Sequence, residues 1–388
     1  MKQILYVFLG VVAGILLGLF SPMPLIRALG SIGFVLGEYV KFVIPLLILA
    51  FVATGIADFG ANAGRALFFG LSLAYVSTIL AEILGFAVGD TLLPWMGVAP
   101  GSVASSIQFA PFLKVEIPVP ISTMGALVLA VIIGLGIAGK KNQALGTLVA
   151  EFRSIIQVTI KRGVLPVFPL WVCFIFMDVT AKGQLIPTLI AFFKVLVLII
   201  PTQWVWLAVL YTVAFLYTRN NALLMFKNML PAYFTAMGTM SSAATLPVAL
   251  ECARKAPFLR RETVDFAMPT VGLAHSPGAA TAITMSALVV SILTKGTMPA
   301  FWDFVPFMIL LGFIEVATVG VPGGSVTAAL GILQSVLLFD STALGLMVAL
   351  FMIQDTFGTA ANVVGDAALT MIIDKAIPGE VPAVAKPE

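Results

Sequence analysis

The amino-acid sequence predicts an all-α integral membrane protein with eight transmembrane helices and two re-entrant helical hairpins. Of its 388 residues, 60% are hydrophobic and only 10% are charged, whereas about a quarter of the residues in a soluble domain are charged. Several apolar runs, such as 186–217, reach the roughly 20 residues that a helix needs to cross a bilayer. We therefore expect a single polytopic unit over 1–388, without a sizeable soluble domain.

The apolar runs define the expected spans. The first run follows Lys2 and lacks a small-residue cleavage site, so it is interpreted as a span and not as a signal peptide. In chain order the spans are expected near 5–20, 32–57, 66–88, 122–139, 163–178, 186–217, 262–293 and 341–373.

Two further apolar segments, 224–252 and 300–336, are broken in the middle by small residues and a proline. The breaks read Ser241-Ser242-Ala243-Ala244-Thr245-Leu246-Pro247 and Gly320-Val321-Pro322-Gly323-Gly324-Ser325. Irregular backbone at membrane depth survives only where protein or a watery cavity satisfies its polar groups. Paired interrupted segments also indicate a transporter built from inverted repeats. We expect a first hairpin and a second hairpin that open from opposite faces toward a central site; two kinked ordinary helices are the alternative.

The positions of the positive charges independently test this arrangement of spans and hairpins, because cytoplasmic loops are rich in Lys and Arg. If each hairpin leaves the membrane by the side it enters, both termini are cytoplasmic, as expected for a multi-pass protein of the inner membrane. The basic cluster in 254–261 then lies inside, and it would move outside if both broken segments crossed fully. The loops assigned to the inside also contain Lys140, Lys141, Arg153, Lys161 and Arg162, whereas those outside contain only Arg27, Lys114, Lys182 and Lys295.

Four carboxylates, Glu82, Glu315, Asp355 and Asp366, lie well within apolar segments. Each costs roughly 2.5–3.5 kcal/mol at a helix centre on insertion scales, so each needs a use or a partner. In the last span the polar residues are Asp355, Thr359, Asn362 and Asp366. Their spacing returns to one face of a helix at about 100° per residue. This ladder of oxygen and amide groups predicts a site for an ammonium group or a sodium ion; a polar packing seam is the alternative.

The span 262–293 contains Gly272-Leu273-Ala274-His275-Ser276-Pro277-Gly278-Ala279. Proline and glycine here are expected to unwind the helix and to free carbonyls for an ion. His275 is the only histidine of the chain, and histidine titrates in the physiological range. His275 and Glu315 are therefore candidate proton carriers, and a structural, hydrogen-bonded role is the alternative for each.

No pattern supports an enzyme. Residues 134–139 match a dinucleotide fingerprint in letters only, because no strand precedes them. One histidine and two distant cysteines, Cys173 and Cys252, predict neither a His-based metal site nor a disulfide framework. No basic block interleaved with aromatic residues suggests nucleic-acid binding. We expect no cofactor apart from a coupling ion, sodium with the proton as alternative.

Three features of the sequence together resemble the dicarboxylate/amino acid:cation symporter family, the glutamate-transporter-like proteins. They are the serine-rich first hairpin tip with Thr245-Leu246-Pro247, the second tip Gly320-Val321-Pro322-Gly323, and the ladder from Asp355 to Asp366. Ile44-Pro45-Leu46 and Gly55-Ile56-Ala57 extend the likeness over nearly the whole chain. The family implies a homotrimer and an elevator mechanism. A scaffold of about 1–65 and 122–182 would hold a transport domain of about 66–90, 186–217 and 224–375, with the hairpins as gates.

The resemblance assigns roles residue by residue. Asp355 resembles the carboxylate that binds the substrate ammonium, and Thr359 and Asn362 the groups that bind its polar atoms, Asn362 chiefly the α-carboxylate. Asp366 resembles the sodium-ligating aspartate. The implied substrate-binding residues are Met240, Ser241, Ser242, Val321, Gly324, Ser325, Asp355, Gly358, Thr359 and Asn362, and the implied cation-binding residues are Gly272, Ala274, Ser276, Thr318, Asn362 and Asp366.

Departures from the family pattern reduce the range of substrates that we expect. Family members that carry acidic substrates have an arginine at one of two positions. This chain has Gly358 at one of them and Met240 at the other. A buried side-chain carboxylate would then lack a cationic partner, which is costly. The family's Asn-Met-Asp-Gly-Thr stretch is replaced by 276–280, which removes a charge from one family sodium site, although Tyr75, Ser77 and Thr78 remain to supply parts of it.

These patterns predict a symporter of small neutral amino acids, such as serine, threonine or alanine, driven by a cation gradient, with sodium as the expected ion. A proton- or sodium-coupled carrier of dicarboxylates or other organic acids is the alternative within the same class. An uncoupled anion channel or a substrate-binding membrane protein is the alternative from another class.

Overall fold

The computed structural model describes residues 2–58, 65–103, 112–113, 115–140, 143–318, 320 and 322–377. Within these ranges every regular element is a helix, as the composition predicts. In chain order the elements are α1 (Lys2–Phe20), α2 (Met23–Asp58), α3 (Arg65–Trp95), α4 (Thr123–Lys140), α5 (Gln143–Thr159), η1 (Ile160–Val164), α6 (Phe168–Ala181), α7 (Leu185–Thr218), α8 (Ala222–Thr239), α9 (Ser242–Ala253), α10 (Arg261–Thr270), η2 (Gly272–Ala274), α11 (Pro277–Lys295), α12 (Phe301–Ala317), α13 (Gly324–Ser335) and α14 (Ser341–Ala376).

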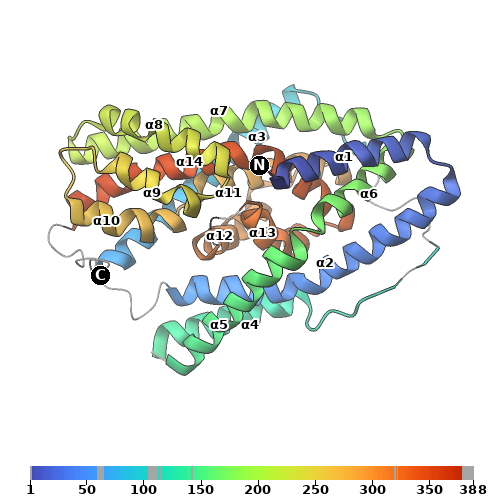
Figure 1. The fold of residues 1–388 in the computed structure, drawn as a ribbon, viewed down its shortest axis with the longest axis horizontal. Helices are drawn as coiled ribbons and strands as arrows, with labels where there is room; N and C mark the ends of the chain where they lie inside the picture. Colours follow the sequence, from blue (N-terminus) through green and yellow to red (C-terminus); the bar gives the residue numbers. More distant parts are fainter. Residues whose placement is uncertain are drawn as a thin grey trace.

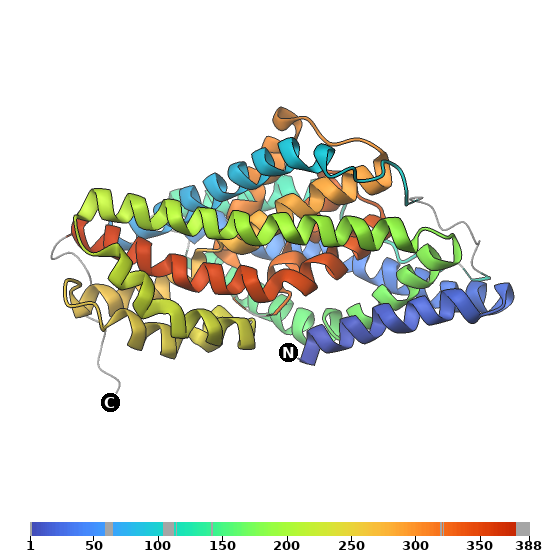
Figure 2. The same cartoon turned by 90° about the horizontal axis from the view of Figure 1, so that it is seen from above.

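Two helices form the centre of the bundle. Every residue of α11 from Pro277 to Leu293 is buried, and a helix that is apolar on all sides belongs in the interior. α11 packs against α3, α7 and α14, and α14 also contacts α8, α9 and α13. α7 and α14 run side by side along the long axis of the molecule (Figures 1 and 2).

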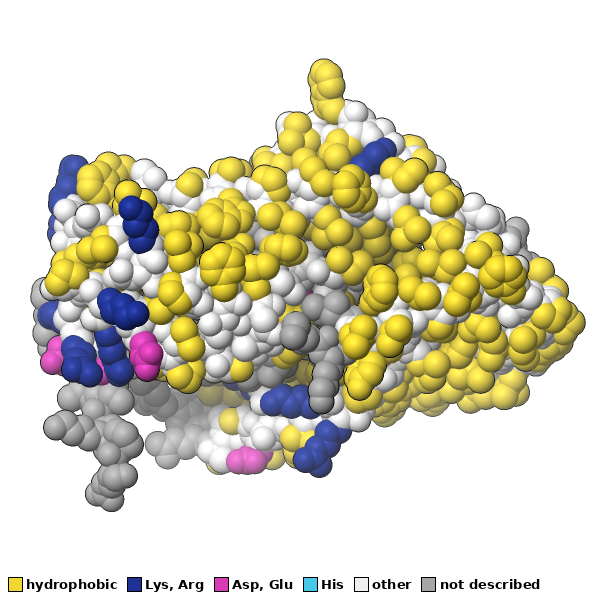
Figure 3. All heavy atoms as spheres, turned by 45° about the horizontal axis from the view of Figure 1, so that its top comes forward, with side chains coloured by type: hydrophobic (Ala, Val, Ile, Leu, Met, Phe, Trp, Pro, Cys, Tyr) yellow, Lys and Arg dark blue, Asp and Glu magenta, His cyan; other side chains and the backbone are white. Residues whose placement is uncertain are grey.

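The surface and the helix lengths are those of a membrane protein. Hydrophobic side chains cover most of the face in Figure 3, and charged side chains gather mainly at one end. Over the described residues, 5 helices are long and apolar enough to cross a membrane, or 6 if a bent pair counts as one span. The expected spans at 5–20 and 122–139 correspond to shorter apolar helices, Leu5–Phe20 and Gly125–Gly139.

Helical structure begins well before residue 163, where the sequence predicts the fifth span to start. Residues 143–162, which we expected in a loop, are helical, and α5 with η1 continues into α6 through a bend of 52°. Pro166 lies at this bend, where its ring prevents a regular helix. The charged residues of α5 interrupt its apolar run, so the hydropathy of the sequence does not identify this helix. Arg153 therefore lies on α5, and Lys161 and Arg162 lie on η1, where the sequence predicts a loop.

Each broken segment forms a pair of packed helices, α8 with α9 and α12 with α13 (Figure 1). α8 ends at Thr239, and Met240 follows it with a left-handed φ of 52°. The next residue, Ser241, begins α9 as its N-cap by accepting a hydrogen bond from Ala244 N at 3.2 Å. Ser is a preferred N-cap, so the serines that break the apolar segment also start its second helix. In the second segment the turn ends at Gly323, with φ 70°.

The seventh span is also broken, as expected from its glycines and proline. α10 ends at Thr270, η2 adds one short turn, and α11 begins with Pro277 at its first position, where a missing N–H is tolerated. α14, by contrast, is continuous over 36 residues. A broken span therefore faces an unbroken polar ladder.

Candidate functional site

The polar ladder of α14 lies inside the bundle. The exposed fractions of Asp355, Thr359 and Asn362 are 5%, and that of Asp366 is 6%. Buried polar groups of this kind need hydrogen-bond partners. Asp355, Thr359, Asn362 and Asp366 each have a hydrogen-bond partner on a broken element or within the ladder, so the site forms where α14 meets the breaks.

Asp355 contacts the tip of the second hairpin. Its Oδ2 accepts a hydrogen bond from Gly323 N at 2.8 Å, and its Oδ1 accepts one from Thr359 Oγ1 at 3.2 Å. The positive φ of Gly323 makes this approach possible. A Cβ at Gly323 would lie 2.8 Å from Met352 Sδ. The turn therefore favours glycine, and without a Cβ the tip packs closely against Met352 of α14.

The two hairpin tips touch each other. Ser241 Oγ donates a hydrogen bond to the Gly320 carbonyl at 2.5 Å. A Cβ on Gly320 would lie 2.9 Å from Ser242 Cβ. Met240, Ser241 and Ser242 are all buried. The tips therefore meet beside the ladder, as expected for two segments that converge on one site.

Asn362 is bound to the N-terminus of α11. Its Oδ1 accepts hydrogen bonds from Gly278 N at 2.7 Å and Ala279 N at 3.4 Å. These are backbone donors that a helix start leaves without intrahelical partners. The Asn362 side chain therefore joins α14 to the first turn of α11.

Asp366 lies against the break of the seventh span. Its Oδ1 is 3.0 Å from His275 Nδ1, and His275 Nε2 is 2.8 Å from Ser77 Oγ. A neutral imidazole satisfies both contacts if Nδ1 donates to the carboxylate and Nε2 accepts from the hydroxyl. On the other side of the carboxylate, a Cβ on Gly272 would lie 3.0 Å from Asp366 Oδ2. Gly272 therefore lets the backbone of the break approach this carboxylate.

Glu315 occupies the same interior. Its exposed fraction is 0%, and its Oε2 accepts a hydrogen bond from Ser325 Oγ at 2.8 Å. Ser276 lies close enough to interact with the same carboxylate. Glu315 thus joins the two helices of the second hairpin and meets the break before α11.

The structure brings together some of the expected residues and not others. Gly272 and Asp366 are neighbours, and Ser276 and Ser325 meet at Glu315. The hydroxyl of Thr318, the residue that follows α12, donates a hydrogen bond to the Ile314 carbonyl. Ala274 and Gly324 are buried near these breaks. The expected ligand Val321 lies outside the described residues.

Sequence reasoning missed several supporting residues. Gln203 of α7 donates to the Gly278 carbonyl at 2.9 Å and to Gln354 Oε1 at 3.3 Å. Tyr211, two turns later, donates to the Val364 carbonyl at 2.9 Å. Both residues carry polar groups in the predominantly apolar run 186–217, and this polarity is the sequence signal that could have identified them. They fix the break before α11 and the ladder of α14 against α7.

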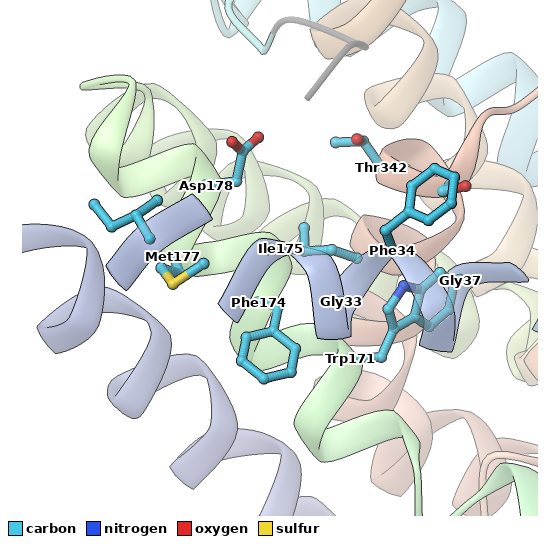
Figure 4. Close-up of a pocket in the computed structure, with 12 residues that line it drawn as sticks. Gly33, Phe34, Gly37, Trp171, Phe174, Ile175, Met177, Asp178 and Thr342 are labelled. Atoms are coloured by element: carbon cyan, nitrogen blue, oxygen red, sulfur yellow. The ribbon is translucent and has the colours of Figure 1, made fainter. Parts of the chain in front are cut away.

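A separate pocket lies away from the ladder (Figure 4). Its lining comes from α2, α6 and the start of α14 and includes Gly33, Trp171, Phe174 and Thr342. Asp178 at its edge is paired with Lys182 at 2.6 Å. The ladder residues do not line this largely apolar pocket, so it is not the site described above.

The chain is similar to amino acid transporters of known name. The serine/threonine transporter SstT of Acinetobacter baylyi is 24% identical over 397 aligned residues, which cover 95% of this chain and 96% of that protein. The neutral amino acid transporter B(0) of Oryctolagus cuniculus is 29% identical over 164 residues, 42% of this chain and 29% of its own length. The excitatory amino acid transporter 2 of Homo sapiens is 28% identical over 152 residues, 39% of this chain and 26% of its own length.

A family model described as the sodium:dicarboxylate symporter family matches residues 4–376, almost the whole chain. The relatives named above are transporters and not enzymes. The chain therefore belongs to the sodium:dicarboxylate symporter family of membrane transporters.

Proposed function

We propose that this protein is a secondary active symporter of small neutral amino acids, with serine, threonine and alanine as its substrates, driven by a sodium gradient. The observation that carries the proposal is the buried ladder, in which Asp355 faces a hairpin tip while Gly358 stands where an arginine would serve an acidic substrate. The names of two relatives, a serine/threonine transporter and a neutral amino acid transporter, support the same substrate class.

The charges around the ladder explain the substrate preference. An amino acid brings an ammonium group and a carboxylate. Asp355 provides the negative charge for the ammonium, and the amide nitrogen of Asn362 provides a donor for the carboxylate. A second substrate carboxylate near Gly358 or Met240 would be buried without a cation at those positions, at a cost of several kcal/mol.

Sodium is the expected coupling ion at Asp366. The carboxylate lies beside the unwound backbone at Gly272, and unwound carbonyls with a carboxylate form the oxygen-rich surroundings that a hard cation prefers. Asn362 lies one turn from Asp366 on the same face. The ion site and the substrate site therefore share a residue, which is a physical route for coupling.

The helix packing supports an elevator mechanism with eight crossings and two re-entrant hairpins. α1 packs on α6, and α2 packs on α4 and α5; these helices would form the scaffold. α3, α7 and both hairpins would move with α11 and α14 as the transport domain. In this proposal the protein is a homotrimer in the inner membrane, with both termini in the cytoplasm.

A proteoliposome assay tests the function. Purified protein is reconstituted, an inward sodium gradient is imposed, and uptake of labelled serine, threonine and alanine is compared with that of aspartate and succinate. We expect the neutral amino acids to accumulate above equilibrium and a sodium ionophore to abolish the accumulation. Accumulation of succinate alone would favour an organic-acid carrier, and equilibration without accumulation would indicate an uncoupled channel.

A further inference from the structure

A groove between α7 and α8 lies outside the proposed transport site. Its lining includes Trp204, Ala208 and Phe215 of α7 and Leu223 and Phe226 of α8. The ring of Phe226 packs edge-on against Trp204, with ring centroids 6.0 Å apart. The volume of the groove is about 540 Å³, which is within the range of natural ligand pockets. None of the described residues that line it is acidic, so the groove accommodates an apolar chain.

The lining of the groove is directed toward the membrane. The exposed fractions of Trp204, Phe215 and Leu223 are 41%, 45% and 62%, and α7 is one of the helices that are long and apolar enough to cross a bilayer. Large apolar side chains that are exposed on such a helix contact acyl chains and not water. Ala208 has a small side chain between Trp204 and Phe215, and it leaves space for an acyl chain.

The length of the groove matches one leaflet of a bilayer. Trp204 and Phe215 are about three turns apart on α7, which is about 16 Å along the helix axis. The hydrocarbon core of a bilayer is about 30 Å thick, so each leaflet contributes about half of that distance. A chain that lies along the groove from Phe215 to Trp204 therefore extends from the membrane surface to the middle of the bilayer.

Basic residues gather at the end of the groove where α7 meets α8. Arg219 follows α7, and its backbone N donates a hydrogen bond to the Phe215 carbonyl at 2.8 Å, so it lies one turn beyond the groove. Lys375 Nζ donates to the Tyr217 carbonyl at 2.6 Å, which places a second cation at the last turn of α7. Lys and Arg side chains are gathered at this end of the molecule (Figures 1 and 3).

Lys227 adds a third cation beside the groove. It lies one turn after Leu223 on α8, and residues four apart share a helix face. In the described part of the chain, neither Lys227 nor Arg219 forms an ion pair, whereas the carboxylate of Asp374 is paired with Arg260. Long basic side chains hold their charge at the headgroup level while their stems lie along apolar surface. Cations without a counter-ion beside an apolar groove match the chemistry of an anionic lipid.

We propose that this groove binds an anionic phospholipid of the cytoplasmic leaflet. One acyl chain lies along the groove against Trp204 and Phe226. The headgroup phosphate pairs with Arg219, Lys227 and Lys375. A water-soluble anion would leave the apolar groove unfilled, and a zwitterionic headgroup would bring a positive charge toward these cations. The inference goes beyond the proposed transport function and uses only the proposed position of the α7–α8 turn at the cytoplasmic surface.

A lipid in this groove contacts a helix that leads to the transport site. α8 begins at Ala222 beside the groove and ends at Thr239, one residue before Met240 at the tip of the first hairpin. The bound headgroup therefore holds the start of the first hairpin at the membrane surface.

Native mass spectrometry of the purified full-length protein in detergent tests the proposal, because it counts bound lipids and subunits together. The probes are phosphatidylglycerol and phosphatidylcholine with identical acyl chains. We expect the parent to bind phosphatidylglycerol more tightly, and Arg219→Gln and Lys227→Gln each to lower that affinity about fivefold. Lys255→Gln removes an exposed lysine between α9 and α10 that does not line the groove. It is the matched control and should keep the parent's affinity.

A second pair of variants tests the groove itself. Ala208→Phe fills the groove and should lose the bound phosphatidylglycerol. Val209→Phe adds the same ring at the next residue, which is exposed but outside the lining, and should bind lipid as the parent does. None of these measurements involves a substrate or sodium, so their outcome is independent of the proposed transport function.

Three outcomes would overturn the lipid site. Equal losses in Lys255→Gln and Arg219→Gln would show only a diffuse attraction of anions to this end of the molecule. Parent-like binding in Ala208→Phe would show that no lipid occupies the groove. A changed number of subunits in Ala208→Phe would identify the groove as a contact between copies of the chain. Should Ala208→Phe not fold, the comparison of Arg219→Gln with Lys255→Gln decides alone.

Discussion

The Asp355 carboxylate accepts a hydrogen bond from Gly323 N at 2.8 Å, so one side chain of α14 contacts the turn of the second hairpin directly. The other oxygen of Asp355 accepts from Thr359. If a substrate ammonium binds Asp355, as we propose, it competes with the contact that holds the hairpin tip. The proposal therefore links substrate binding to the position of the hairpin through one carboxylate.

The first prediction concerns Asp355→Asn. Asparagine retains an oxygen that can accept from Gly323, so the protein should fold, but the substrate ammonium loses its charged partner. A hydrogen bond to a charged group contributes about 1.5–3 kcal/mol, so serine binding should weaken at least about tenfold. Equilibrium binding of labelled serine measures the effect, and the exposed Asp303→Asn on α12 is the control. Parent-like serine affinity would show that Asp355 does not bind the ammonium.

The second prediction introduces a cation at Gly358. A Cβ at this position would lie 3.4 Å from Ala279 N, an ordinary contact, so a side chain can begin there without moving α11. Gly358→Arg should shift the preference from serine toward aspartate or glutamate, because the arginine pairs with a side-chain carboxylate. Competition of each amino acid with labelled serine reads the shift, with Gly358→Gln as the uncharged control. An unchanged order of affinities would mean that position 358 does not face the substrate.

The third prediction concerns the contact between the hairpin tips. Ser241→Ala removes the bond to the Gly320 carbonyl and the cap on Ala244 N. Loss of an N-cap costs about 0.5–2 kcal/mol, so the tips should separate more readily. The dissociation rate of bound serine should rise, and Ser241→Thr, which keeps the hydroxyl, should retain most of the parent's rate. Equal rates of serine dissociation in the parent, Ser241→Ala and Ser241→Thr would show that this contact between the tips does not control substrate release.

The ladder and the breaks could be predicted because local sequence determines both. The spacing of Asp355, Thr359, Asn362 and Asp366 sets a common face on any unbroken helix, and Ser241 interrupts a helix and caps the next. The start of the fifth span could not be predicted from hydropathy. α5 includes Arg153, which donates a hydrogen bond to the Ala317 carbonyl at the end of α12, and only the packed structure provides that partner.

The hydrogen-bond partners of the ladder residues could not be predicted from the sequence either. No local pattern shows that Asn362 binds Gly278 N, or that His275 lies between Asp366 and Ser77. These contacts join residues far apart in the chain, and they depend on how closely α11 approaches α14. The sequence shows that 276–280, which includes Gly278, lacks a charge of the family pattern, whereas only the fold shows how closely Gly278 approaches α14.

The fourth prediction follows from that close approach. A Cβ on Gly278 would lie 2.9 Å from Ala361 Cβ and 3.0 Å from Asn362 Oδ1, closer than packed side chains tolerate. Gly278→Asp should therefore not restore an additional sodium site, and it should destabilise the protein by about 1–3 kcal/mol through overpacking. Thermal unfolding in detergent measures the loss, with Gly136→Ala, where a Cβ meets no atom within 4 Å, as the control. A variant with the parent's melting temperature and an added sodium ion would contradict this steric account.

The last prediction decides the coupling ion. Both ring nitrogens of His275 are engaged, one by Asp366 and one by Ser77, which favours a positioning role for the imidazole over proton transport. We expect uptake to require sodium, and Asp366→Asn to weaken the sodium dependence, because the asparagine removes the charge that faces the break at Gly272. His275→Gln, which keeps a hydrogen-bonding side chain, should retain more sodium affinity than His275→Ala. The rival is proton coupling through Glu315 or His275. Uptake in sodium-free choline buffer with an imposed pH gradient distinguishes the two mechanisms. If the parent is fully active in this buffer and Glu315→Gln or His275→Ala abolishes that activity, sodium coupling at Asp366 is rejected. The coupling site would then be Glu315 or His275.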